Sequence, residues 1–212
     1  EVVLPSTLTR IGECAFYGCS GLKAIEIPES VSAIGSYAFY ECIGLSGVVL
    51  PSALETIPYY AFYGCTGLRS VTVSEGTTNI ADHAFRGCTG LSEVSLPEGL
   101  LTIQYQAFRG CTGLEEVILP DSVEGIGCFA FGECTKLESI NYPLNWRRTI
   151  SSGSYDSTGN NGQIFSGCSS LKKIEVPEGV TEIPGYAFNG CDYLEEVVLP
   201  STLTRIGECA FY

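Results

Sequence analysis

The chain contains few histidines and few positive charges. It has one histidine, one tryptophan and no methionine, and 24 aspartate and glutamate residues outnumber 11 lysine and arginine residues. Nucleic acids and anionic membrane surfaces both bind clustered positive charge, so the formal net charge of -13 argues against either partner. We therefore expect no nucleic-acid binding.

The sequence also lacks long apolar segments. No run of 18 apolar residues is present, and no segment resembles a signal peptide, so we expect no membrane insertion. Because methionine is absent and residue 1 falls within a repeating unit, we expect the chain to be an internal part of a longer protein.

A 23-residue repeat dominates what is present. Leucine recurs at positions 22, 45, 68, 91, 114, 137, 171 and 194, and a cysteine stands three residues before each. Phenylalanine follows the same period at positions 16, 39, 62, 85, 108, 131, 165, 188 and 211. Self-similarity of this kind is typical of repeat proteins, in which each unit packs on its neighbours.

One unit, residues 91–113, shows the expected local structure. Val94 and Leu96 alternate with exposed positions, which predicts a short strand with one buried face, and Pro97 ends it. Apolar residues then recur at spacings of three and four as far as Phe108, which predicts a short turn or 3₁₀ segment. We predict one elongated domain, 1–212, of about nine units with stacked parallel strands.

The cysteines follow the repeat more closely than a disulfide framework would. Eight of the 11 keep one place in the unit, which indicates a ladder of small buried thiols. The other three, Cys14, Cys128 and Cys209, precede the Ala-Phe pair and are expected to be more exposed. The cysteines therefore do not reveal the redox compartment.

The pattern LxxVxLPxxLxxIxxxAFxxCxG resembles the BspA-type class of leucine-rich repeat found in bacterial surface antigens. The resemblance implies a mainly β, right-handed solenoid with a parallel sheet on its concave face and short turns or 3₁₀ segments on its convex face. Members of this class are mostly secreted or cell-surface proteins of host-associated bacteria. An extracellular or cell-surface location is thus implied, with a host extracellular-matrix or mucosal protein as a conceivable partner.

One insertion interrupts the repeat. Leu137 and Leu171 are 34 residues apart, so 11 residues are added within 144–163, where residues 151–162 read as a flexible Gly/Ser loop. Asp156, Asn160 and Asn161 could contact calcium, but their spacing does not match a calcium-binding loop. Trp146, just before this loop, aligns with core positions of other units and is expected to fill space there.

Catalysis is not expected. His83 stands where other units carry Tyr37 or Tyr60, so it fits a stacked row, and its conceivable partner Cys88 belongs to the buried cysteine ladder. Neither residue has the setting that activates a nucleophile. With no CxxC pair for a metal, we predict no enzyme activity, no metal site and no cofactor.

Candidate binding residues fall in two surface rows. The first lies on the exposed positions of the strands, where apolar anchors have acidic neighbours: Val49, Thr72, Glu93, Ser95, Glu116 and Ile118. Its alternative explanation is that β-branched residues are present for strand propensity. The second row follows the phenylalanines and comprises Tyr17, Tyr40, Tyr63, Arg86 and Arg109. Tyrosine and arginine are frequent in interface hot spots, but stacking that stabilises the fold explains this row equally well.

Residues 1–17 and 196–212 are identical, and neither end carries a polar cap, so end-to-end self-association is possible. These features favour a non-enzymatic protein-binding module, and the family resemblance implies adhesion as part of a bacterial cell-surface or secreted protein. Two alternatives stay open: a structural spacer or targeting repeat array within a larger surface enzyme or anchored protein, and carbohydrate binding by the tyrosine row.

Overall fold

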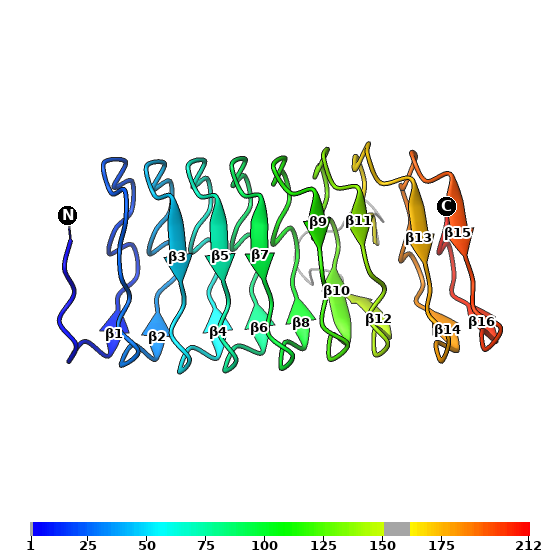
Figure 1. The fold of residues 1–212 in the computed structure, drawn as a ribbon, viewed down its shortest axis with the longest axis horizontal. Helices are drawn as coiled ribbons and strands as arrows, with labels where there is room; N and C mark the ends of the chain where they lie inside the picture. The colour runs from blue at the N-terminus through cyan, green and yellow to red at the C-terminus, as the bar shows by residue number, and fades with distance from the viewer. Residues whose placement is uncertain (1, 151–161) are drawn as a thin grey trace.

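The computed structural model describes residues 2–150 and 162–212 and shows turns of chain stacked in one direction. Figure 1 shows two ladders of short strands running along the stack, with the two termini at its opposite ends. All 16 strands span only two or three residues, and the described residues contain no helix. The predicted repeat solenoid of parallel strands is confirmed.

The first ladder is the predicted one. Its strands are β3 (Gly47–Val49), β5 (Ser70–Thr72), β7 (Glu93–Ser95), β9 (Glu116–Val117), β11 (Ser139–Ile140), β13 (Lys173–Glu175) and β15 (Glu196–Val198). Pairing is parallel at a register of one repeat, as in Val48 opposite Val71 opposite Val94. The central residue of each three-residue strand points into the core and its neighbours point out, and we call this outer surface the strand face.

A second ladder was not predicted. It contains β1 (Arg10–Ile11), β2 (Ala33–Ile34), β4 (Thr56–Ile57), β6 (Asn79–Ile80), β8 (Thr102–Ile103), β10 (Gly125–Gly127), β12 (Arg148–Ile150), β14 (Glu182–Ile183) and β16 (Arg205–Ile206). Its isoleucines were expected to point inward, and Ile57, Ile80 and Ile103 are fully buried. Most of these strands are only two residues long, which is too short for an alternating pattern to reveal them.

The Ala-Phe segments form a third, non-strand ladder. The residue before each alanine adopts a left-handed conformation, with φ of 58° at Tyr37, 56° at Tyr60 and 61° at His83. Successive backbone N–H groups then bond alternately to the next turn and within their own turn. The Phe39 N–H donates to Ala61 O of the next turn at 2.8 Å, and the Tyr40 N–H donates to Tyr37 O of the same turn at 3.2 Å. This alternation satisfies the backbone without a 3₁₀ helix, and none occurs in the described part of the chain.

The core consists of like residues stacked on one another. Phe39 and Phe62 lie 5.1 Å apart with nearly parallel rings, and Phe62 and Phe85 lie 5.2 Å apart. The Cys65 thiol donates to Phe39 O at 3.1 Å, and its counterparts repeat this bond along the stack. Burial raises the pKa of the Cys42 thiol to about 12, which keeps it protonated. All 11 cysteines are free thiols, and six of the eight in the predicted ladder are buried. Cys19, in the first turn, is exposed and Cys191 is half-buried, so the predicted buried ladder is confirmed only for the inner turns.

The expectation that Cys128 is more exposed is wrong. Cys14 and Cys209 are exposed, but Cys128 is buried at 3% exposure. The Gly162 N–H donates to Cys128 Sγ at 3.2 Å, so backbone at the end of the inserted loop covers this thiol.

We expect Phe85→Ala to lower the free energy of unfolding by about 3–5 kcal/mol, because it leaves a cavity between two stacked rings. Phe129→Ala is the control: Phe129 is also an aromatic residue, but it is only half-buried and stands outside this stack. Urea unfolding followed by circular dichroism measures both. An equal loss of stability in the two variants would contradict the role given to the phenylalanine ladder.

Candidate partner-binding surface

The strand-face candidates lie side by side in the solvent. Val49 and Ile118 are 62% and 68% exposed, although both are large apolar residues. The parallel register places Val49 beside Thr72 and Thr72 beside Ser95, so these three residues are aligned from turn to turn. Within the described residues, pairing is interrupted between β7 and β9, before Glu116 and Ile118. The predicted exposure of this row is confirmed; its role in binding stays a prediction.

Shallow grooves run along the strand face. One, of ≈ 480 Å³, is lined in part by Thr72, Glu93, Ser95, Glu116 and Ile118. Another, of ≈ 530 Å³, lies between neighbouring strands and includes Val49 and Thr72. All six strand-face candidates therefore contribute to hollows of a size that accepts side chains of a partner.

The stack is wider at the insertion than elsewhere. The ring spacing in the phenylalanine ladder rises from 5.2 Å between Phe85 and Phe108 to 5.9 Å between Phe131 and Phe165. It is 6.0 Å between Phe165 and Phe188 and returns to 5.2 Å at the next step. In the part of the chain that the structure describes, β11 does not pair with β13, and β12 does not pair with β14. Among the described strands, pairing is also interrupted between β7 and β9 and between β2 and β4, and at the insertion both ladders are interrupted at the same boundary. We call this boundary the joint.

Two large aromatic residues occupy the joint. Tyr142 and Trp146 stand one repeat after Leu119 and Val123, and both are buried as those residues are. Their rings lie 5.0 Å apart, and both contact Phe188 of the following turn. The predicted burial of Trp146 is thus confirmed. Because these rings are larger than the side chains they replace, we infer that they hold the two turns apart.

Polar groups of this aromatic pair are also satisfied. The Trp146 indole N–H donates to Arg148 O at 2.9 Å, and the Tyr142 hydroxyl donates across the joint to Glu182 O at 3.4 Å. Burial raises the pKa of the Tyr142 hydroxyl above its ordinary range. The pair is therefore a fixed part of the core rather than an exposed binding feature.

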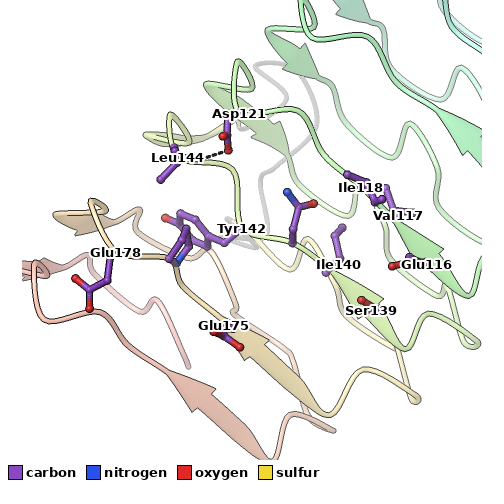
Figure 2. A pocket seen from close by; sticks show the side chains of 12 residues that line it. Glu116, Val117, Ile118, Asp121, Ser139, Ile140, Tyr142, Leu144, Glu175 and Glu178 are labelled. Atoms are coloured by element: carbon purple, nitrogen blue, oxygen red, sulfur yellow. Dashed lines mark hydrogen bonds between the residues drawn. The ribbon is translucent and has the colours of Figure 1, made fainter.

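On the strand face the joint opens into a groove of ≈ 540 Å³, which we call the joint groove. Figure 2 shows Glu116 and Ile118 on its β9 side, Glu175 and Glu178 on its β13 side, and Tyr142 between them. The remaining lining residues are Val117, Asp121, Ser139, Ile140, Asn141, Leu144 and Pro177. Sequence analysis found Glu116 and Ile118 but missed the groove, because the widening depends on how two core aromatics pack.

The joint groove is negatively charged. Glu116, Asp121, Glu175 and Glu178 line it, and none of its lining residues is a lysine, arginine or histidine. Two hydrogen bonds from Ser201 lower the pKa of Glu178, which keeps this carboxylate ionised. The larger effect comes from the Ser201 backbone N–H and the smaller from its hydroxyl. Lys173, in β13, directs its amine to Glu196 at 3.0 Å.

The tyrosine row is stacked on itself. Tyr40 lies 4.6 Å from Tyr17 and 4.8 Å from Tyr63, in near-parallel pairs, and the Arg86 guanidinium lies 5.8 Å from the Tyr63 ring. Arg109 instead contacts the Phe129 ring at 5.1 Å and pairs with Glu133 at 2.6 Å. Since both faces of Tyr40 are covered, little ring face is left for a sugar. The arrangement favours a structural role for these rings.

The chain was next compared with known proteins. A family model described as the BspA type leucine-rich repeat region matches residues 1–112, 55–161 and 161–212, in six copies. The chain belongs to the BspA-type leucine-rich repeat family. No significant match is found among functionally curated proteins.

Solved structures of bacterial leucine-rich repeat proteins resemble this family member. A T. pallidum leucine-rich repeat protein is 32% identical with a TM-score of 0.59, over 76% of this chain and 72% of that one. A Bacteroides ovatus protein is 27% identical with a TM-score of 0.52, over 100% and 72%. A leucine rich cell surface protein of Faecalibacterium prausnitzii, 23% identical with a TM-score of 0.50, shares the fold over 93% and 52%.

Within residues 2–150 and 162–212, no group of three or more His, Cys, Asp or Glu side chains could hold a metal ion. The described segments also lack a helix long and apolar enough to cross a membrane. Asp156, Asn160 and Asn161 lie outside the described residues.

His83 is stacked in the row beside the tyrosines, 4.4 Å from the Tyr60 ring, as predicted. Burial, with smaller contributions from Arg86 and Arg109, lowers its pKa to about 4. Its ordinary value is about 6.5. The folded chain therefore binds fewer protons than the unfolded chain between pH 6.5 and about 4. Stability contributed by the neutral imidazole is present above pH 6.5 and is lost as the pH falls through this window.

We expect the wild-type chain to lose about 1–3 kcal/mol more stability than His83→Tyr when the pH is lowered from 7 to 4. The variant restores the residue of neighbouring units and removes the titrating group. Urea unfolding at the two pH values measures the difference, and NMR titration of this single histidine gives its pKa directly. A pKa near 6.5 in the folded chain would refute the assignment.

Proposed function

We propose that this chain is a non-enzymatic protein-binding module that acts at a bacterial cell surface and binds its partner through the strand face. The observation that carries the proposal is the strong exposure of Val49, at the end of β3, and of Ile118, directly after β9, on the outer surface of the first strand ladder. Both side chains line grooves of the strand face, where residues of a partner can bury them on binding.

The size of the strand face suits a protein partner. Seven strands at about 4.8 Å spacing extend over roughly 30 Å, which is comparable to one side of an ordinary protein–protein interface. Covering an isoleucine such as Ile118 contributes about 1.5–3 kcal/mol before the costs of association. Several shallow grooves along one rigid surface therefore fit a partner that makes repeated small contacts better than a single deep-bound ligand.

The cellular location rests on family membership. BspA-type repeats resemble those of bacterial surface antigens, and the F. prausnitzii protein that shares this fold is named a cell surface protein. For this chain we propose an extracellular or cell-surface location and adhesion to a host extracellular-matrix or mucosal protein.

A retention assay tests the proposal. The chain is immobilised under reducing conditions and offered purified matrix and mucosal proteins, and the same is done with the double variant Val49→Glu, Ile118→Lys. We expect saturable retention of a partner by the wild type and at least a tenfold loss in the variant, because charges replace two apolar anchors. Ile43→Lys is the matched control, since Ile43 is also exposed, at 49%, but lies outside the strand face.

Two results would overturn the proposal. One is equal loss of retention in Ile43→Lys, which would show that the substitutions act without regard to the surface. The other is no saturable retention by a wild-type chain whose folding is verified by circular dichroism, and this result would favour a structural spacer in a larger surface protein.

A further inference from the structure

We propose that the joint groove binds a basic, partly apolar segment of the partner protein, with lysine or arginine side chains beside the groove carboxylates and apolar side chains against Ile118 and Leu144. This proposal deepens the protein-binding function above and rests on it. It assigns a place on the strand face and a chemical class of partner segment.

The groove is a consequence of the core rather than a loose surface feature. Tyr142 and Trp146 are 4% and 3% exposed, and their contacts with Phe188 accompany the widened ring spacing beneath the groove. The wall on one side is β9 and β11, which pair with each other, and the wall on the other is β13, which pairs with β15. Both walls are therefore held by sheet pairing, and the space between them is fixed by packing.

Apolar contact is available at two exposed positions of this groove. Ile118 is 68% exposed and Leu144 is 43% exposed, while Ile140, Val117 and Tyr142 of the lining are buried. A volume of ≈ 540 Å³ is within the range of pockets that hold short peptide segments or drug-sized molecules.

Charge decides which segment fits. Four carboxylates and no basic residue line the groove, so an acidic segment would be repelled and a basic one attracted. Among the described residues these carboxylates do not form a group that could hold a metal ion. They are spread along the groove, from Glu116 on one wall to Glu178 on the other, which suits several separate cationic side chains better than one ion.

Defined peptides test the proposal with the intact chain. The probe is a fluorescein-labelled peptide of alternating leucine and lysine, about eight residues long and roughly 26 Å when extended. Fluorescence anisotropy measures its affinity, alongside leucine–glutamate and serine–lysine peptides of equal length. We expect the leucine–lysine peptide to bind more tightly than both others, and its affinity to fall with rising salt.

Matched variants locate the binding. Glu175→Gln is expected to weaken the leucine–lysine peptide about two- to fivefold, the range of an exposed ion pair. Glu26→Gln is the control, because Glu26 is exposed at the same position of its repeat but does not line the joint groove. Ile118→Ser and Val49→Ser form a second pair of the same design, and only Ile118→Ser should weaken the peptide.

Three results would overturn the proposal: equal binding of the leucine–glutamate peptide, equal effects of Glu26→Gln and Glu175→Gln, or no measurable binding of the leucine–lysine peptide. The retention assay distinguishes a joint groove that binds no peptide from a strand face that binds no partner. If Val49→Glu alone abolishes retention of the protein partner and Glu175→Gln has no effect, the strand face binds but the joint groove does not.

Discussion

The structure depends on one constraint: each turn must hydrogen-bond to the next at the fixed spacing of a parallel sheet. Three backbone ladders follow it, two made of strands and one made of Ala-Phe turns. In the described residues, strand pairing is interrupted between β2 and β4, between β7 and β9, and at the joint. Stacked phenylalanine rings about 5 Å apart and thiols that donate to the phenylalanine carbonyls fit that spacing. Backbone pairing and side-chain stacking therefore share one period, and the same side chains can fill the core in every turn.

Residues that depart from the repeat change the spacing between turns. Where Tyr142 and Trp146 replace smaller residues, the ring spacing grows and strand pairing is absent in both ladders of the described chain. The strand face there holds an acidic groove instead of a uniform sheet. The core thus creates a distinct surface at one place in an otherwise regular array, and such a place can give a repeat protein selectivity for one partner.

Much of this architecture could be predicted from the sequence, because period and alternation encode burial directly. The exposure of Val49 and Ile118 and the burial of Trp146 followed from alignment of the units alone. The second strand ladder could not be predicted from strands that are mostly two residues long, and the burial of Cys128 depends on Gly162, at the end of the inserted loop. The joint groove was also missed, since it arises from the packing of Tyr142 and Trp146 against a following turn. The positions of these residues in the sequence do not reveal the distance between the two turns at the joint.

The central claim is that Tyr142 and Trp146 hold the joint open. Hydrogen–deuterium exchange, followed by mass spectrometry, compares the wild type with the double variant Tyr142→Leu, Trp146→Val, whose side chains match those of the preceding turn in size. The account predicts slower exchange across residues 171–183 in the variant, because the turns can then approach and pair. Unchanged or faster exchange there would show that the aromatic pair fills a gap set by the insertion and does not create it.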